Sequence, residues 1–189
     1  MATSRTQLAN LALMRLGGSL LTDLDADDTE EASKCRLLFE ELRDQLLVAG
    51  HWAFAIKRVA LALLGTEPAY GFSYKHQLPT DCLLVISVND EVYYHTEYKI
   101  EGTTLLTDDN LVYIRYVAQI SDPAQWSPMF KQTFVLRLAL ELSYDMRADK
   151  QLTEMLARQY LTMLHEALAI DGQQGTADLL VANDLNEVR

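Results

Sequence analysis

The chain has 189 residues, of which 49% are hydrophobic and 23% charged, a balance typical of globular proteins that fold without metal or disulfide support. Its net charge of −11 argues against a DNA-binding surface, since binding to phosphates needs clusters of Lys and Arg. The sequence has no run of about 18 apolar residues, so we expect no membrane span, and residues 1–18 lack the unbroken apolar core of a signal peptide.

Two helices are predicted within the first 50 residues. Ser4 followed by Gln7 is a capping box, and Gly17–Gly18 is expected to end the helix that this box begins. Asp28, with Glu31 three residues later, signals the start of a second helix. That helix is expected to bury one apolar stripe, formed by Ala32, Cys35, Leu38, Phe39, Leu42, Leu46 and Ala49.

The second helix runs into an elbow, Gly50–His51–Trp52. A glycine costs about 1 kcal/mol inside a helix, so here it indicates a bend or break. A shorter helix is expected to follow from Phe54 to Leu64. Trp52 has two interpretations: it is buried in a joint between helices, or it belongs to a contact between subunits. The buried joint is favoured, because a buried Trp removes on the order of 150–250 Å² from water.

Helical periodicity is absent from residues 65–125, where we expect a small antiparallel β-module. The same region carries three basic and nine acidic side chains, a net charge of −6. Turn signals such as Asn89–Asp90 and Glu101–Gly102 divide it into a meander of short strands. A Tyr-rich segment from Tyr70 to Leu78 is expected at its edge. The predicted strands are Leu83–Val88, Val92–His95, Tyr98–Ile100, Thr104–Leu106 and Val112–Gln119.

Helical periodicity returns after Pro128, and Asp149 is expected to cap the last helix, which Gly172 ends. The predicted fold class is therefore α+β. Residues 1–64 and 126–172 are expected to form a helical bundle, with the small antiparallel β-module of residues 65–125 inserted between its helices.

Two sets of side chains are candidates for contact with other proteins. Residues 173–189 form a polar tail, expected to be mobile until it binds a partner, with apolar side chains at Leu179, Leu180, Val181 and Leu185. The β-module contributes Tyr93, Tyr94 and Tyr98, with Tyr113 and Tyr116 nearby in the same region. Surfaces on which nucleic-acid bases stack have basic neighbours, whereas acidic residues surround these tyrosines. Two interpretations therefore remain for the tyrosines: packing between strands, or an interface with another protein.

No motif predicts a catalytic, cofactor-binding or metal site. Asp23, Asp25 and Asp27 have the spacing of a calcium loop, but its glycine position holds Asp28 and its final glutamate position holds Lys34. The four histidines lack metal-ligand spacing, and the two cysteines form no CxxC pair. We expect a protein with no enzyme activity and no cofactor. A hydrolase site assembled only in three dimensions stays as an alternative.

One ordered set of motifs is more specific than any of these signals. After a helix that contains Cys35, it consists of Arg43–Leu47 (RDQLL), Gly50–Ala55 (GHWAFA) with Lys57–Arg58 after it, Tyr74–Leu84 (YKHQLPTDCLL), Trp126–Phe130 (WSPMF) and Arg137–Ser143 (RLALELS). Between the third and fourth of these motifs comes a strand that ends in Ile114–Val117 (IRYV). This order resembles the tail tubular protein A family of short-tailed phages, which are head–tail connector or adaptor proteins. The resemblance extends over roughly Leu8 to Asp171.

The resemblance implies a virion structural protein of a phage or prophage, located in the tail or neck and in the host cytoplasm before assembly. It implies a homo-oligomeric ring, expected to be a dodecamer, that joins the portal protein to the tail nozzle protein around the DNA channel. DNA is expected to pass without specific binding, which suits the negative charge. The acidic β-module leaves an alternative: a soluble acidic binding module or regulator that acts on a host protein.

Overall fold

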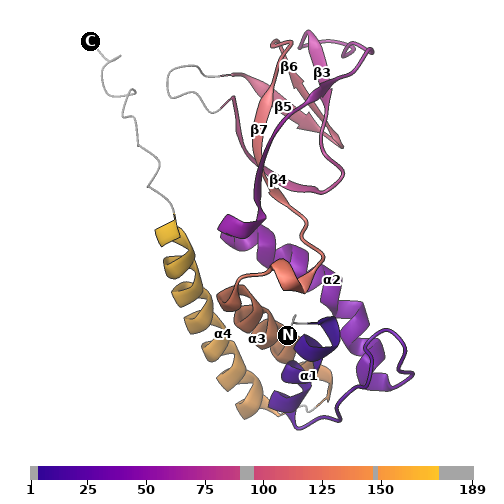
Figure 1. Cartoon of the computed structure of the whole chain (residues 1–189), viewed down its shortest axis with the longest axis vertical. Coiled ribbons are helices and arrows are strands. Elements are labelled where there is room, and N and C mark those ends of the chain that lie inside the picture. The colour runs from indigo at the N-terminus through magenta and orange to yellow at the C-terminus, as the bar shows by residue number, and fades with distance from the viewer. Residues whose placement is uncertain (1–3, 90–95, 147–148, 175–189) are drawn as a thin grey trace.

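The computed structural model describes residues 4–89, 96–146 and 149–174 of the chain. The molecule is elongated, with the α-helices gathered at one end and the strands at the other (Figure 1). The strands lie in the sequence between the second and third helices and pair only in antiparallel fashion within the described residues. The α+β fold class is therefore confirmed.

α1 (Arg5–Leu16) begins and ends at the residues that the sequence indicates. The Ser4 hydroxyl accepts a hydrogen bond from the Gln7 N–H at 3.1 Å, which satisfies one of the backbone donors that every helix start leaves unpaired. Gly17 ends the helix in the left-handed conformation, with φ of 63°, which glycine adopts without steric cost.

α2 (Glu30–Gly50) starts one residue later than the sequence suggests. Its cap is Thr29, whose hydroxyl accepts a hydrogen bond from the Ala32 N–H at 3.2 Å, and Asp28 lies outside the helix. The helix start was predicted to within one residue, but the capping residue was wrong, because Asp28 and Thr29 are both residue types that cap helices.

α3 (Pro128–Met146) is the central helix, and α1, α2 and α4 (Lys150–Asp171) all pack against it. In Figure 1 α3 lies between α4 and α1. The Asp149 carboxylate caps α4, as predicted, by accepting hydrogen bonds from two backbone N–H groups. Because other elements cover α3 on several sides, its buried residues are not confined to one face of the helix. They are Phe130, Thr133, Phe134, Val135, Leu136, Leu138, Ala139, Leu140, Leu142 and Ser143.

The short helix expected after the elbow is absent, and that prediction was wrong. After one 3₁₀ turn (Ala53–Ala55) the chain forms β1 (Ile56–Ala60) and β2 (Ala62–Leu63). β1 pairs with β7 (Tyr113–Ala118). Ala and Leu favour a helix locally, but the hydrogen-bonded ladder with β7 overrides that preference. The extended region therefore begins at Ile56 instead of after residue 64.

The β-module contains two sheets, where the sequence suggested one meander. Its other strands are β3 (Tyr74–Gln77), β4 (Cys82–Val88), β5 (Tyr98–Glu101) and β6 (Thr104–Thr107). One sheet has the order β1-β7-β4 and the other the order β2-β3-β6-β5. Only Leu61, which is buried, separates β1 from β2, so the chain passes from one sheet directly into the other.

Most predicted strands are confirmed to within a residue or two, namely β4, β5, β6 and β7. The Tyr-rich segment was expected at an edge, but β3 lies between β2 and β6. The prediction was wrong because β2, which covers the outer side of β3, comes from the segment that was expected to be helical. The predicted strand at 92–95 lies outside the described residues.

A cluster of aromatic rings fills the core where the helices meet the β-module. Phe130 on α3 is at its centre, with ring centroids 5.1 Å from Trp52, 5.1 Å from Phe54 and 5.0 Å from Trp126. All three pairs are edge-to-face, the arrangement in which the positive edge of one ring meets the negative face of another. These contacts join the elbow, the segment after β7 and α3 in one packed unit.

The elbow is a close backbone turn closed by Trp52. His51 ends α2 in the left-handed conformation, with φ of 47°. The Trp52 indole N–H donates to the Leu46 carbonyl at 2.7 Å, in the last turn of α2, so this buried donor is satisfied. A Cβ at Gly50 would lie 2.5 Å from the indole nitrogen, so the glycine is required by this close approach. Gly50 is the last residue of α2, so the predicted break at this glycine is confirmed.

We expect Trp52→Ala to lower the free energy of unfolding by about 3–5 kcal/mol, because the substitution leaves a cavity in the aromatic cluster. Chemical denaturation followed by circular dichroism measures this loss. Leu37→Ala on α2 is the control: Leu37 is 78% exposed, so its truncation should change stability by no more than about 0.5 kcal/mol. Equal losses in the two variants would contradict the central position of Trp52.

Candidate assembly interface

The candidate interface residues predicted from the sequence have different positions in the fold. Trp52 is fully buried within the chain, as the joint interpretation expects, but the joint connects α2 to β1 and not to a second helix. The buried ring offers no exposed surface to a neighbouring subunit. Tyr98, at the start of β5, is 41% exposed and available for contact. The remaining candidates lie outside the described residues: Tyr93, Tyr94, Leu179, Leu180, Val181 and Leu185.

β5 is an outer strand of the second sheet, and all of its residues are exposed. Tyr98 and Ile100 alternate with charged residues and therefore lie on one side of the strand. β6 is its neighbour in the described sheet, so the opposite edge of β5 presents N–H and C=O groups to which another strand can bind. Tyr113 is also exposed, whereas Tyr116 is buried. Tyr98 and Tyr113 are therefore surface residues, and Tyr116 packs within the fold.

A polar contact holds the three strands of the first sheet together beside the helices. The Lys57 ammonium on β1 lies 2.7 Å from the Asp81 carboxylate, which precedes β4. The Tyr116 hydroxyl on β7 donates to the other oxygen of Asp81 at 3.1 Å. The Asp81 backbone carbonyl accepts a hydrogen bond from the Gln119 N–H at 2.7 Å. Asp81 is thus a structural residue that connects β1, β4 and β7.

These contacts determine the protonation of Asp81 and Tyr116. Burial raises the pKa of the Asp81 carboxyl, but hydrogen bonds from Lys57 and Tyr116 outweigh burial and hold that pKa below its ordinary value of 3.8. Burial, together with the hydrogen bond to Asp81, raises the pKa of the Tyr116 hydroxyl to about 12. At neutral pH the carboxylate is therefore charged and the phenol is a neutral donor.

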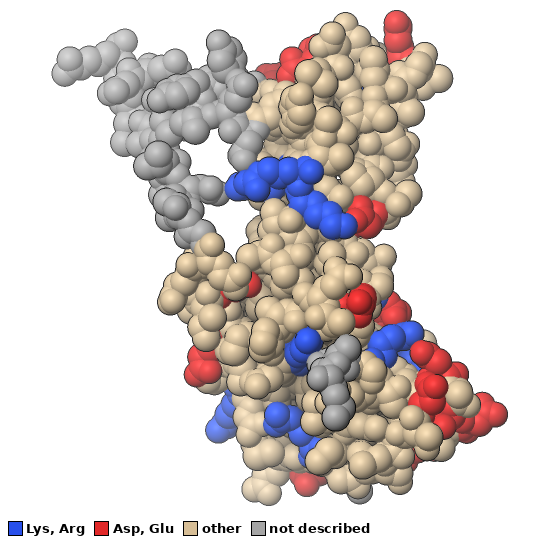
Figure 2. Space-filling view, viewed as in Figure 1, with Lys and Arg blue, Asp and Glu red and all other residues tan. Residues whose placement is uncertain are grey.

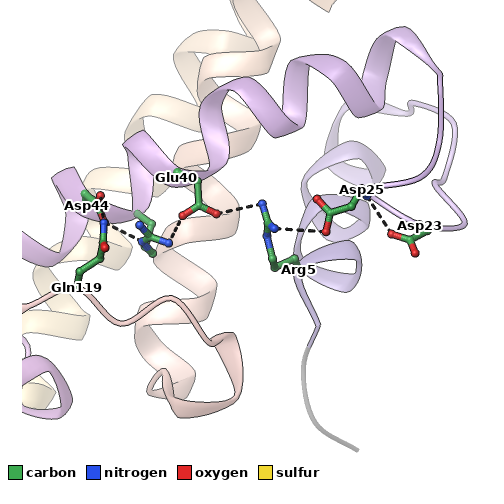
Figure 3. A network of polar contacts seen from close by, with 7 residues as sticks. Arg5, Asp23, Asp25, Glu40, Asp44 and Gln119 are labelled. Carbon is green, nitrogen blue, oxygen red and sulfur yellow. Dashed lines mark hydrogen bonds and ion pairs between the residues drawn. The ribbon is translucent and has the colours of Figure 1, made fainter. Parts of the chain in front are cut away.

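A second polar network runs along α2 from the N-terminal segment to the end of β7 (Figure 3). Arg5 contacts Glu40 at 3.0 Å, and Glu40 also pairs with Arg43, which is only 2% exposed. Arg43 donates to Asp44 at 2.7 Å, and Asp44 accepts a hydrogen bond from the Gln119 amide at 2.7 Å. The buried charge of Arg43 is therefore compensated by two carboxylates, without which its burial would be strongly destabilising.

Asp171 connects the end of α4 to the elbow, over a separation of 118 residues. Its carboxylate accepts a hydrogen bond from the Ala53 N–H at 2.7 Å, at the start of the 3₁₀ turn. The side chain is largely buried, and Gln174 donates to its second oxygen at 3.3 Å. In the sequence, Asp171 is an acidic residue in the last turn of a predicted helix, where the helix dipole disfavours negative charge. This unfavourable position was a signal that Asp171 has a specific partner, and the sequence analysis missed it.

Basic side chains gather where the β-module joins the helices, in contrast to the acidic composition of the whole chain. Figure 2 shows a band of Lys and Arg across this narrow part of the molecule. Lys57 and Arg58 extend from β1, and Arg115 extends from β7 directly opposite Arg58 in the ladder. A groove of about 350 Å³ lies beside the arginine pair, lined also by Tyr113 and Ile114.

The described residues show no group of three or more His, Cys, Asp or Glu that is arranged to hold a metal ion. Cys35 is buried and unpaired, and burial, followed by the nearby Glu31 charge, raises the pKa of its thiol to about 11. Buried His76 places Nε2 3.0 Å from the Asp109 carbonyl, so this nitrogen carries the proton and donates. These side chains act in packing and hydrogen bonding at the positions they occupy.

Comparison with known proteins gives no family assignment. Neither a scan against models of protein families nor a search of curated protein sequences finds a match to this chain. In the part of the chain that the structure describes, no helix combines the length and apolar character needed to cross a membrane.

We expect Asp81→Asn to remove an acid-sensitive part of the protein's stability. Because the pKa of Asp81 is lower in the folded state, its charged form stabilises the fold above the unfolded-state value of about 3.8, and this contribution is lost as the pH falls through the folded-state pKa. The variant should therefore melt below the parent at pH 7, and the difference should shrink below about pH 3.8. Glu67→Gln, at an exposed loop position, should follow the parent at every pH.

We expect Asp171→Ala to loosen the attachment of α4, at a cost of about 1–3 kcal/mol, because the Ala53 N–H loses its acceptor in a partly buried position. Hydrogen exchange at the Ala53 amide should accelerate in this variant. Asp171→Asn keeps an oxygen acceptor and should retain most of the protection. Unchanged exchange at Ala53 in Asp171→Ala would show that the contact does not hold this end of α4.

Proposed function

We propose that this chain is a structural head–tail adaptor of a phage or prophage. It forms a ring, expected to be a dodecamer by resemblance, that joins the portal protein to the tail nozzle protein around the DNA channel. Its action is binding and assembly, without catalysis and without a cofactor. It acts in the neck or tail of the virion and occurs in the host cytoplasm before assembly.

The observation that carries the proposal is the convergence of the motif residues at the junction between helices and β-module. Arg43 and Asp44 of the first motif reach Gln119, and Trp52 of the second closes the elbow. Asp81 of the third connects the strands of the first sheet, and Phe130 of the fourth is the centre of the aromatic cluster. Motifs that are far apart in the sequence thus lie together at the junction between the helices and the β-module. Such clustering is expected of a protein family whose members share a fold.

Charge and surface add support. DNA must slide through an adaptor without being retained, and a net charge of −11 on each subunit opposes adhesion of phosphates. A ring also needs surfaces that meet neighbouring subunits, and among the described strands only β6 pairs with β5, which carries the exposed Tyr98 and Ile100. The helical part supplies a packed body from which the β-module projects (Figure 1).

The proposal predicts that the purified chain forms a ring-shaped complex when it is mixed with the portal protein of the same phage. Negative-stain electron microscopy of the mixture should show a ring attached to one face of the portal, with a rotational symmetry of about twelve. A portal from an unrelated phage is the control and should remain bare. The absence of any complex with the matching portal would overturn the adaptor function. One stoichiometric host protein recovered from lysate would then favour the host-directed alternative.

A further inference from the structure

α4 carries apolar side chains that the described fold covers only in part. The helix packs against α3 at the margin of the helical part, and three of its 22 residues are buried (Figure 1). Beside the buried face, four apolar side chains recur at the spacing of one helical stripe. We call them the α4 flank: Ala157, Leu161, Leu164 and Leu168. Leu161 is 53% exposed and the other three are half-buried, so part of this apolar surface is open to water.

The α4 flank extends to the elbow, close to the point where the tail begins. A Cβ at Gly50 would lie 2.7 Å from Cδ2 of Leu168, so Leu168 lies against the elbow. α4 ends three residues later, and the 3₁₀ turn Gly172–Gln174 follows it. Residues 175–189 come directly after this turn and lie outside the described residues. A segment of 15 residues therefore starts within a short stretch of chain from the flank.

The sequence of the tail contains the signals of an amphipathic helix. Thr176 is a residue type that caps helices, and Asp178 would lie in the first turn, where the helix dipole favours negative charge. Apolar residues recur at helical spacing, at Ala177, Val181, Leu185 and Val188. The opposite side of such a helix is polar, with Asn183, Asn186 and Glu187. The pattern therefore predicts a helix over residues 177–188 with one apolar stripe.

The apolar positions of the tail match those of the α4 flank on either side of the turn. Leu161 and Val188 are equally distant in sequence from the midpoint between residues 174 and 175. The same holds for Leu164 with Leu185 and for Leu168 with Val181. In a pair of antiparallel helices joined by a short loop, residues equally distant from the loop lie at the same level. The match therefore brings three apolar pairs together over about 10 Å of helix.

We propose that residues 177–188 form a helix that binds the α4 flank of the same chain, in a helical hairpin closed by residues 172–176. A helix of this length is marginal in water by itself, so burial of its apolar stripe against Leu161 and Leu164 supplies the stabilisation that it needs. This inference goes beyond the proposed function, since it concerns a single subunit and does not depend on a ring.

The same chain is favoured over a second copy as the source of the tail helix. Loops of about two to five residues join antiparallel helices, and residues 172–176 form a linker of that length. So short a linker gives the tail an effective concentration of about 1 mM or more at the flank, with which a separate copy has to compete. Leu179 and Leu180 lie outside the apolar stripe, so docking leaves these two candidate interface residues available to another protein.

Two pairs of cysteines test the register of the hairpin in the full chain. The first pair is Leu161→Cys with Val188→Cys, which the hairpin places at the same level. The control pair is Leu161→Cys with Val181→Cys, which the hairpin separates by about 10 Å along the helix. Under mild oxidation the first pair should form an intramolecular disulfide about tenfold faster or more, because the control pair is beyond disulfide reach. Peptide mapping by mass spectrometry distinguishes this bond from any made by Cys35 or Cys82.

Two results of this experiment overturn the proposal. Equal rates for the two pairs show that the tail has no fixed register on α4. Disulfides that join two copies, with none formed within a chain even in dilute solution, assign the flank to the tail of a neighbouring copy.

Hydrogen exchange followed by mass spectrometry gives a second readout. Val181→Asp with Leu185→Asp places two charges in the apolar stripe. Asn183→Asp with Asn186→Asp adds the same two charges on the opposite side of the helix and is the matched control. The amides of residues 177–188 should exchange about tenfold or more slowly in the parent and the control than in the first variant. Equally fast exchange in all three proteins overturns the docked tail.

These experiments separate the docked tail from the adaptor function. Both use the purified chain without portal protein, so their results decide the hairpin whether or not a ring forms on the portal. A parent that binds the portal but shows neither the selective disulfide nor the slow exchange keeps the adaptor function and loses the hairpin.

Discussion

Closure of the elbow by Trp52 is the contact on which the rest of the structure depends. The indole N–H donates to the carbonyl of Leu46, which holds the turn by which the chain leaves α2. His51 adopts the left-handed conformation that this turn needs, and Gly50 leaves room for the ring. β1 then starts at Ile56 in register with β7, so the turn at Trp52 lies directly before the first strand of the β-module. The burial of that ring supplies the free energy that stabilises an otherwise tight backbone turn.

Three carboxylates reinforce the elbow, each bonded to groups from distant segments. Asp44 binds Gln119 after β7, Asp81 binds Lys57 and Tyr116, and Asp171 binds the Ala53 N–H. Charge-assisted hydrogen bonds of this kind are shorter and stronger than neutral ones, and the loss of one partner leaves a poorly solvated group behind. The helices and the β-module are thus connected at several points around the aromatic cluster, which is the arrangement expected of a rigid joint.

Most of the motif residues that support the adaptor proposal are buried, whereas the exposed strand β5 lies outside the motifs. The motif residues lie at the junction and specify shape, as the buried Trp52 and the paired Asp81 show. β5 and the acidic loop before α2 are exposed and belong to no motif, whereas Arg58, which is also exposed, is part of one. A shared shape with different surfaces is how one fold serves different partners, because affinity and specificity reside in side chains at the interface.

The sequence by itself determined the elements whose signals are local. The Ser4 and Asp149 caps and the alternating strand β7 needed only neighbouring residues to be recognised. The tertiary structure alone decided the rest: the segment after the elbow became β1 and β2, because β7 and β3 supplied hydrogen-bonding partners that its Ala and Leu residues do not reveal. It also brought together Asp171 with the elbow and Arg58 with Arg115, since contacts between remote segments depend on how the elements pack and leave no periodic trace in the sequence.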